Sequence, residues 1–495
     1  MCGILLVKSQ STIPLDKHLS AVELLQRRGP DLTRYQYSNN TFVAQTVLHV
    51  TGTDNFYHKT NKDFFAYNGE IYDYRWFGRI DNDVELAYST AKTRPSKFRY
   101  FDGPWAWCYV DGDQVSYATD PQGERLLYQY QDADILIVCS EVAPILEYIH
   151  AKPNIVPYQN KCWTMISQTP WKGITRCEPG RLYRNGQPAE QIDSIWSWIV
   201  PTATRTEQEI LDEFEQCWQR ACDITKVTIP ATLSYSGGID SNLILNHVPD
   251  LNLVSINTLG KDQITNSLAQ FLKPAELERL TSIPVDTEAW AHEYQQLIKQ
   301  TRMPAQTWSY VGKWLVAKNT KTKVIYTGLA ADELFGGYEL YKNLQYTTQG
   351  STSPYSSDDH EGIWSQCMDA YQGDARQATL LMDYWYQVVG VDAPGLDRLG
   401  GAWGRETRNP FMTKTMMTFA LNLPWEYKVN TVTKPLLRKH FCRRWQSDLM
   451  LPKEGFAGHA NDALPWLDID FTPTGNRHSD WQHIAQQTFY EYTKH

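Results

Sequence analysis

The first 200 residues consist mainly of short apolar runs separated by turn residues. Runs of this length that are rich in β-branched and aromatic residues are typical of strands. The pattern predicts strands at residues 2–8, 41–50, 64–68, 106–111, 114–119 and 134–139. It also predicts helices at residues 15–26 and 84–92. We therefore expect residues 1–200 to form a layered, β-rich domain with a few helices.

The pattern changes after a boundary at residues 201–205. Thr206 and Glu209 form a T-x-x-E capping box, and apolar residues follow it at helical spacing. Beyond this helix, strand-like runs alternate with helical segments. The expected strands are 227–234, 253–257 and 323–327, and the expected helices start at 241 and span 308–318. Such alternation is typical of parallel strands joined by crossover helices.

The composition of residues 347–362, rich in Ser, Thr, Gly, Asp and Pro, predicts an exposed loop. The rest of the chain has a mainly helical pattern. We therefore expect a second domain, residues 201–495, of the α/β class with a parallel sheet. Two domains also fit the length, because 495 residues exceed what one hydrophobic core usually organises.

Charge and cysteine content narrow the class of protein. The net charge of -9 disfavours nucleic acid or an anionic membrane as partner, because such binding needs clustered Lys and Arg. No apolar run approaches the roughly 18 to 20 residues of a membrane helix, and we see no secretory leader. The nine cysteines are scattered without a C-x-x-C pair, which is typical of a reducing compartment. We expect a cytoplasmic protein.

Cys2 is the first candidate for chemistry. If Met1 is removed, Cys2 carries both a thiol and an α-amine of pKa about 7.7 to 8.0, which can accept the thiol proton. The same region holds R-G-P-D at 28–31 and N-G-E-I-Y at 68–72. Asn68 and Gly69 allow two interpretations: a hairpin turn, or donors that face a developing oxyanion.

A glycine-rich string, S-G-G-I-D-S at 236–241, follows an apolar strand and opens a helix. Glycines let the backbone approach a phosphate, and the N–H groups of the helix start favour an anion. The alternative is a tight turn capped by Asp240 or Ser241. The chain lacks G-x-x-x-x-G-K-[ST], which disfavours γ-phosphoryl transfer.

Three further strings lie downstream. T-G-L-A-A-D-E-L-F-G-G-Y at 327–338 again follows a strand, and its acidic pair alone would fit a solvated turn. K-P-L-L-R at 434–438 begins with a lysine, a residue that is usually solvated. In W-G-R-E-T-R-N-P-F at 403–411, Glu406 and Arg408 fit either a structural ion pair or an acceptor pocket, and we favour the ion pair.

Taken together, M-C-G-I, R-G-P-D and N-G-E-I-Y resemble the class II glutamine amidotransferase domain, an N-terminal-nucleophile hydrolase fold of stacked antiparallel β-sheets. The later strings resemble the ATP-pyrophosphatase (adenine nucleotide alpha hydrolase-like) domain of asparagine synthetases. The order of these motifs, over nearly the entire chain, is similar to that of the glutamine-hydrolysing asparagine synthetase family. The resemblance implies glutamine, ATP and a small carboxylic acid, with aspartate first, as substrates, and Mg²⁺ as cofactor.

The resemblance also implies roles for individual residues. Cys2 would form a γ-glutamyl thioester while Asn68 and Gly69 hold the oxyanion. Glutamine would be bound by Asn68, Gly69, Glu70 and Asp83. Mg²⁺ would be held by Asp240 and Asp332. ATP and pyrophosphate would be bound by Tyr235, Ser236, Gly237, Gly238, Asp240, Ser241, Ile256, Thr327, Gly328 and Lys434. The released ammonia would reach an acyl-adenylate through an internal passage.

Two positions depart from the family pattern. Val47 occupies the place of an arginine that contacts the glutamine carboxylate, so His49, Arg75 or another cation would have to replace it. Leu329 stands where the family has a glutamate linked to the acyl-adenylate and the incoming ammonia. Three hypotheses follow: asparagine synthesis, amidation of another carboxylate on a sugar, peptide or secondary metabolite, and a catalytically weakened binding relative. The assembly is also open, with a homodimer as one form.

Overall fold

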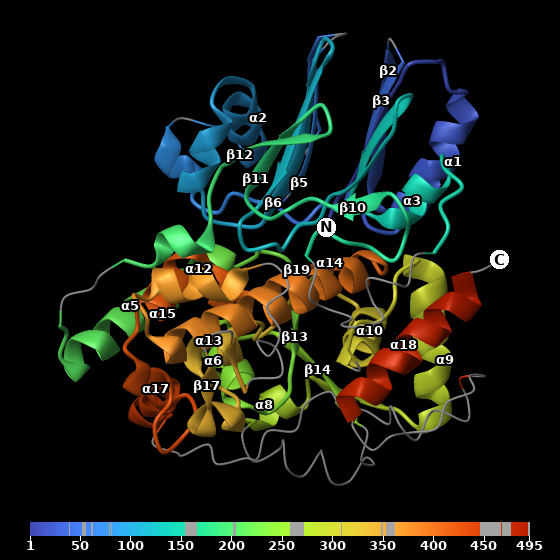
Figure 1. Cartoon of the computed structure of the whole chain (residues 1–495). Helices are drawn as coiled ribbons and strands as arrows, with labels where there is room; N and C mark the ends of the chain where they lie inside the picture. Colours follow the sequence, from blue (N-terminus) through green and yellow to red (C-terminus); the bar gives the residue numbers. More distant parts are fainter. Residues whose placement is uncertain are drawn as a thin grey trace.

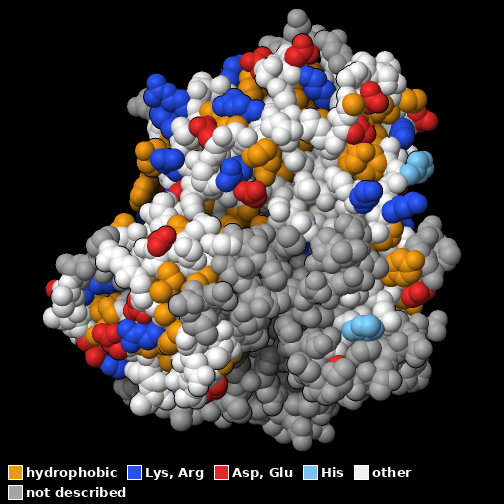
Figure 2. Space-filling model, viewed as in Figure 1, with side chains coloured by type: hydrophobic (Ala, Val, Ile, Leu, Met, Phe, Trp, Pro, Cys, Tyr) orange, Lys and Arg blue, Asp and Glu red, His pale blue; other side chains and the backbone are white. Residues whose placement is uncertain are grey.

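The computed structural model describes residues 1–38, 40–51, 56–60, 63–78, 80, 82–153, 166–200, 204–257, 272–307, 309–347, 350–352, 362–445, 467 and 477–493. Figure 1 shows two parts, with antiparallel sheets above and a helix-rich part that contains a parallel sheet below. On the face in Figure 2, acidic and basic side chains are interspersed over the upper part. Among the described residues, none of the helices has the length and apolar character needed to span a membrane.

Two six-stranded antiparallel sheets form the N-terminal part. One sheet has the order β10 (Ile174–Arg176), β8 (Tyr128–Gln131), β9 (Ile135–Cys139), β1 (Gly3–Ser9), β3 (Thr41–Val47) and β2 (Leu32–Ser38). The other has the order β12 (Gln187–Gln191), β11 (Arg181–Arg184), β7 (Gln114–Thr119), β6 (Trp105–Asp111), β5 (Asp63–Gly69) and β4 (Phe56–Thr60). The predicted stacked antiparallel architecture is confirmed.

Both faces of β1 are buried, which explains its uninterrupted apolar sequence. Ile4 and Leu6 point into the core between the sheets, whereas Leu5 and Val7 pack in the cluster that includes helix α1 (Leu15–Leu25). This alternation is the period of two expected for a strand. Helix α3 (Val142–Leu146) covers the same outer face as α1. Helix α2 (Asp83–Thr93) covers the other sheet.

The second part is built on a five-stranded parallel sheet. Its order is β15 (Leu280–Pro284), β14 (Asn252–Asn257), β13 (Ala231–Ser234), β16 (Val324–Tyr326) and β19 (Glu406–Arg408). The α/β prediction is confirmed, although the strand expected from residue 227 starts only at Ala231. The chain winds one way from β13 to β14 and the other way to β16. Ligands of open α/β sheets bind at such a switch point, at the carboxyl ends of the strands.

Helices surround this sheet. The predicted capping box of Thr206 and Glu209 starts the first of them. The helices are α5 (Glu207–Thr225), α6 (Ile239–His247), α8 (Pro274–Leu277), α9 (Thr287–Thr301), α10 (Ser309–Asn319), α11 (Ala331–Phe335), α12 (Ile363–Ala370), α13 (Ala375–Asp383), α14 (Ala393–Gly401), α15 (Lys414–Leu421), α16 (Trp425–Lys428), α17 (Pro435–Trp445) and α18 (Arg477–Thr493). A π-helical segment, Tyr384–Asp392, joins α13 to α14.

The predicted loop at 347–362 lies largely outside the described residues, as does Trp308 of the predicted helix 308–318. Where the loop segment is described, β17 (Tyr346–Thr347) pairs with β18 (Gly350–Ser351). The expectation of a mainly helical remainder is correct for most described residues after 362. It is wrong for β19, because a strand of three residues is too short to show the alternating sequence pattern of a strand.

Candidate active sites

Cys2 is buried where β1 begins, and Asn68 lies beside it at the end of β5. The Cys2 backbone N–H donates to Asn68 Oδ1 over 2.8 Å. Asn68 Nδ2 is buried and has no hydrogen-bond partner among the described residues. A buried amide donor without an acceptor is costly in a folded protein. It is therefore well suited to an oxyanion that arrives with a substrate.

Gly69 is required by the close approach of two strands. A Cβ at Gly69 would lie 2.1 Å from the carbonyl oxygen of Pro104, and φ is +150°. Asn68 and Gly69 pair with Ala106 and Trp105 of β6. The hairpin-turn interpretation of Asn-Gly is therefore wrong, since both residues belong to the strand.

Two carboxylates lie close to this strand end. Asp83, at the start of α2, accepts a hydrogen bond from the Ile71 N–H over 3.1 Å. Burial and then the charge of Glu70 raise the pKa of Asp83 to about 7. Glu70 forms an ion pair with Arg408 of β19. Burial raises the pKa of Glu70 although Arg408 opposes the shift.

The structure places the positions around Val47 as follows. Val47 is fully buried in β3, opposite Leu32. The His49 N–H donates to Asp31 Oδ2 over 2.8 Å, and Lys323 donates to the His49 carbonyl. Arg75 is exposed, and its guanidinium lies 5.5 Å from the ring centre of the adjacent tyrosine. These contacts therefore assign neither His49 nor Arg75 to the role of the carboxylate-binding arginine that Val47 replaces.

Buried charges join the two parts near Cys2. Arg28 donates from Nε to the Cys2 carbonyl over 3.0 Å and from Nη2 to Asp397 of α14 over 2.9 Å. Both side chains of this ion pair are 0% exposed. Arg125, which sequence reasoning missed, lies 3.9 Å from Asp397 and 3.9 Å from Glu406.

Glu406 belongs to the same cluster. Its carboxylate lies 2.8 Å from Arg408 and 3.4 Å from the α-amine of Met1. Burial opposes ionisation, but the charges of Arg408, the α-amine and Arg125 lower the pKa of Glu406 to about 2. The ion-pair interpretation of Glu406 and Arg408 is confirmed.

The glycine-rich string forms the connection from β13 to α6. Gly238 is the N-cap of α6, and Gly237 has a φ of +74°. Asn242 donates to the carbonyls of Gly237 and Gly238, each over 3.0 Å. Ser241 Oγ donates to the Gly238 carbonyl over 3.0 Å. Neither Asp240 nor Ser241 caps the helix, so the interpretation as a capped turn is wrong.

Asp240 and Asp332 face one cation, the ammonium of Lys434. Lys434 Nζ lies 2.7 Å from both oxygens of Asp240 and 2.7 Å from Asp332 Oδ1. These carboxylates, which follow β13 and β16, therefore meet at the switch point of the sheet. Burial alone would lower the pKa of Lys434, but the two carboxylates raise it. Paired hard oxygen ligands of this kind suit Mg²⁺.

Two glycines make room for these carboxylates. A Cβ at Gly337 would lie 1.9 Å from Asp332 Oδ1, and one at Gly328 would lie 2.9 Å from the Asp240 Cβ. Ala330 adopts a φ of +72°, a conformation that glycine adopts more readily. The backbone conformation of residues 327–338 thus allows the Asp332 carboxylate to lie against the glycine-rich loop.

The remaining predicted residues lie around this centre. Tyr235 is buried and its hydroxyl donates to Asn242 over 3.2 Å. Leu329 is half-buried against the main core of the second part, and its N–H donates to Thr327 Oγ1 over 3.3 Å. Ser236 Oγ accepts from the Gly238 N–H over 3.3 Å. Ile256 differs, because it packs on β14 within apolar clusters.

A hydrogen-bonded chain leads from the second centre to the N-terminal part. Thr327 Oγ1 donates to Asn409 Oδ1, and Asn409 Nδ2 donates to Glu124 Oε2 over 2.6 Å. Burial and then the charge of Asp120 raise the pKa of Glu124 to about 8. Sequence reasoning missed Asn409 and Glu124. Asn409 follows the E-T-R sequence of β19 directly, which is the signal that could have identified it.

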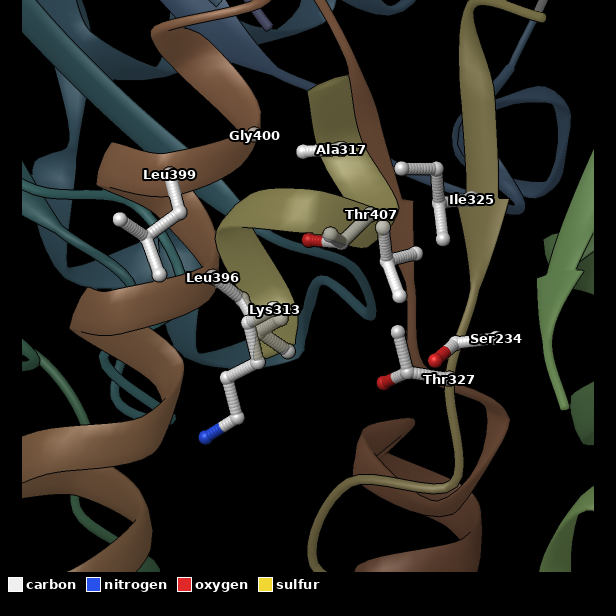
Figure 3. A pocket seen from close by; sticks show the side chains of 10 residues that line it. Ser234, Lys313, Ala317, Ile325, Thr327, Leu396, Leu399, Gly400 and Thr407 are labelled. Carbon is white, nitrogen blue, oxygen red and sulfur yellow. The ribbon is translucent and has the colours of Figure 1, made fainter. Parts of the chain in front are cut away.

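A small pocket lies between the two centres (Figure 3). Ser234 and Thr327 line it at the carboxyl ends of the strands, and Leu399 and Gly400 of α14 line it on the other side. A Cβ at Gly400 would lie 2.7 Å from Met1 Cε, so this wall abuts the residue before Cys2. The pocket has room for a water-sized molecule.

This chain is similar in sequence to several known proteins. The family model described as asparagine synthase matches residues 209–464. Amidase chyE of Penicillium rubens is 22% identical over 68% of this chain and 56% of that protein, so the chain spans about half of that relative. A probable glutamine-hydrolysing asparagine synthetase of Schizosaccharomyces pombe is 24% identical over 92% of this chain and 82% of that protein. Among solved structures, the glutamine phosphoribosylpyrophosphate amidotransferase from B. subtilis is 14% identical with a TM-score of 0.29, covering 58% of this chain and 65% of that one.

Proposed function

The chain belongs to the asparagine synthase family, and from this we propose that it is a glutamine- and ATP-dependent enzyme that converts a carboxylic acid into an amide. We assign the glutaminase to residues 1–200 and the synthetase to residues 201–495. The observation that carries the proposal is the meeting of Asp240 and Asp332 at one cation beside the glycine-rich loop. This arrangement matches what release of pyrophosphate from ATP requires.

In the glutaminase, the Cys2 thiolate attacks the side-chain amide carbon of glutamine, and the α-amine freed by removal of Met1 accepts the thiol proton. The N–H groups of Asn68 Nδ2 and Gly69 stabilise the oxyanion, which supplies the acceptor that Asn68 Nδ2 lacks. Ammonia leaves, and water hydrolyses the thioester to glutamate. Asp83 and Glu70 bind the glutamine ammonium group, a role that Asp83 performs only in its ionised form.

In the synthetase, an oxygen of the acceptor carboxylate attacks the α-phosphorus of ATP, and pyrophosphate leaves. The loop residues 236–241 bind its phosphates through N–H and hydroxyl groups, with Lys434 as counter-charge. Asp240 and Asp332 would hold Mg²⁺, which would supply further positive charge to the pyrophosphate. Ammonia then attacks the acyl carbon of the adenylate, and AMP leaves with the formation of the amide.

We propose that the pocket between the centres is part of the path of ammonia. Apolar residues of α10, α14 and β16 form most of its wall, and the pocket has room for a molecule the size of water or ammonia. Apolar surroundings keep ammonia in its neutral, nucleophilic form and keep water from the adenylate.

Aspartate is the first candidate acceptor, by family membership. A different carboxylic acid is the second candidate, because Leu329 replaces the glutamate of the family motif and because one relative is named an amidase. We also place the protein in the cytoplasm, which fits a sequence whose cysteines are scattered without a C-x-x-C pair. A homodimer is the assembly that we would test first.

The test measures pyrophosphate release from Mg²⁺ATP with ammonium and a panel of carboxylic acids. Release on addition of aspartate supports asparagine synthesis, and release only with another acid identifies the second candidate. Asp240→Asn should abolish the signal, whereas Asp250→Asn, a change at a side chain that is 96% exposed, should leave it intact. Absence of release with every acid, together with no ammonia from glutamine, would favour the weakened relative instead.

A further inference from the structure

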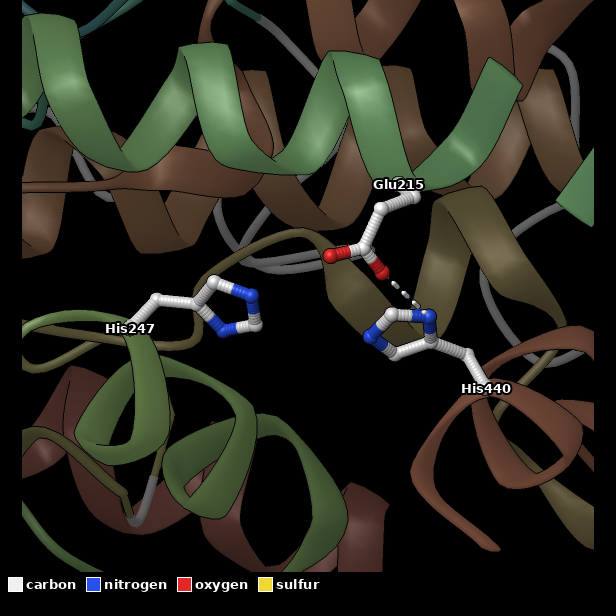
Figure 4. Close-up of side chains that lie close together, drawn as sticks. All are labelled: Glu215, His247 and His440. Atoms are coloured by element: carbon white, nitrogen blue, oxygen red, sulfur yellow. Dashed lines mark ion pairs between the residues drawn. The ribbon is translucent and has the colours of Figure 1, made fainter. Parts of the chain in front are cut away.

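Three helices of the synthetase part bring metal-binding side chains together away from the loop. Glu215 lies on α5, His247 is the last residue of α6, and His440 lies on α17. One ligand atom from each lies within 4.8 Å of the other two. Figure 4 shows the two imidazole rings on either side of the Glu215 carboxylate.

Neighbouring side chains hold these groups in place. Glu215 Oε2 lies 3.1 Å from His440 Nδ1. The two imidazole rings are nearly parallel, with 6.2 Å between their centres and 27° between their planes. The ring of Phe214 packs edge-on to the ring of His440, with 4.9 Å between the ring centres. The ring of Trp218 packs edge-on to that of His247, with 5.7 Å between the ring centres. The packing therefore limits how far the rings can turn from one another.

Two imidazoles and a carboxylate are a donor set of known Zn²⁺ sites. Bonds of about 2.0 to 2.2 Å place tetrahedral ligand atoms about 3.3 to 3.6 Å from one another. The Glu215–His440 distance of 3.1 Å is close to this range, and the limit of 4.8 Å for the other pairs needs only small side-chain rotations. His440 is buried, whereas the Glu215 side chain is 44% exposed. Solvent therefore has access to the cluster, and a water molecule can complete the coordination.

His247 has contacts that fit two tautomers. Its Nδ1 lies 2.9 Å from the Trp218 Nε1–H, a donor, and 3.0 Å from the Leu243 carbonyl, an acceptor. When Nδ1 accepts from Trp218, the proton of the neutral ring is on Nε2. When Nδ1 donates to Leu243, Nε2 has a free electron pair, and a backbone carbonyl is a common outer partner of metal-bound histidine.

We propose that Glu215, His247 and His440 bind a divalent transition-metal ion, with Zn²⁺ as the ion that best fits the ligands. Binding selects the tautomer in which His247 donates to Leu243. The site is structural, because it links α5, α6 and α17. Helix α6 starts at the pyrophosphate loop and α17 starts at the residue after Lys434. The ion therefore fixes the relative positions of two helices whose first turns carry the groups that contact pyrophosphate.

The experiment uses the full-length, chelator-treated protein with saturating Mg²⁺, which occupies hard carboxylate sites. Co²⁺ serves as a spectroscopic probe, and Zn²⁺ is titrated against it. We expect one saturable site with the visible absorption of a tetrahedral nitrogen and oxygen environment, without a thiolate-to-cobalt band from Cys2. Glu215→Gln and His440→Ala should each weaken binding at least about tenfold, since changes even to outer partners of ligands act on that scale.

The matched control is His292→Ala, which removes a histidine of α9 whose side chain is 62% exposed. It should bind Co²⁺ and Zn²⁺ like the unmodified protein. Zn²⁺ should also raise the thermal midpoint of the unmodified protein and not that of Glu215→Gln. Because Glu215 is partly exposed, this variant tests the site even where His440→Ala fails to fold. Equal metal affinity in Glu215→Gln and the unmodified protein, or no saturable binding in either, would overturn the proposal.

Discussion

Replacement of Lys434 by methionine isolates the charge arrangement at the synthetase centre. Lys434 Nζ lies 2.7 Å from Asp240 and 2.7 Å from Asp332, so those carboxylate oxygens are at most twice 2.7 Å, or 5.4 Å, apart. Without the ammonium, two negative charges face one another at this separation. At an effective dielectric constant of about 20 their repulsion is about 3 kcal/mol. The two carboxylates are only 20% and 19% exposed, so solvent screens this repulsion little.

We expect Lys434→Met to lower the free energy of unfolding by up to about 3 kcal/mol in the absence of divalent ions. Added Mg²⁺ should restore much of this loss, because the ion replaces the missing positive charge between the carboxylates. Urea unfolding with and without Mg²⁺ measures both effects. Pyrophosphate release should also fall by about 10²- to 10³-fold, the usual cost of losing one charge-stabilising group.

Lys439→Met is the matched control, on the helix that starts directly after Lys434. Lys439 pairs with Glu207 over 2.8 Å, but both side chains are about half exposed (49% and 52%). Exposed pairs contribute at most about 1 kcal/mol, so this variant should show little loss of stability and no response to Mg²⁺. If Lys434→Met behaves like Lys439→Met, the two aspartates do not share a cation and the reasoning fails.

Three further predictions concern the glutaminase and the seam between the parts. Asn68→Ala should lower ammonia release from glutamine by about 10²- to 10³-fold while ammonium-dependent pyrophosphate release persists; equal loss of both activities would argue against an oxyanion role. The KM for glutamine should fall as pH rises through about 7, because only ionised Asp83 pairs with the substrate ammonium, and Asp83→Asn should remove this dependence. Arg28→Met should destabilise the chain by about 3 to 5 kcal/mol in urea unfolding, because it leaves Asp397 charged and 0% exposed; a change below 1 kcal/mol would contradict the importance of this ion pair.

The sequence was most informative where the chemistry depends on a short, continuous sequence motif. The loop at 236–241 and the acidic string at 327–338 each follow an apolar strand, so adjacent parallel strands could be expected to bring Asp240 and Asp332 together. Strands with two buried faces were likewise predictable. Strand β12 was not, because all its residues are exposed and polar residues dominate it.

Contacts between the two parts could not be predicted from local pattern. Arg125 and Glu124 lie far in sequence from Glu406 and Asn409, and only tertiary packing brings these charges together. The pattern also placed Asn68 and Gly69 in either a turn or an oxyanion site. Pairing with β6 excludes the turn, a conclusion that needs the neighbouring strand.

The products formed from ATP test the central claim most directly. The purified chain would be incubated with Mg²⁺ATP, glutamine and the acid that supports turnover, and the nucleotides and phosphates would be separated by chromatography. A pyrophosphate loop with Asp240 and Asp332 on one cation predicts AMP and pyrophosphate in equal amounts, one of each per amide. Formation of ADP and orthophosphate would contradict the account.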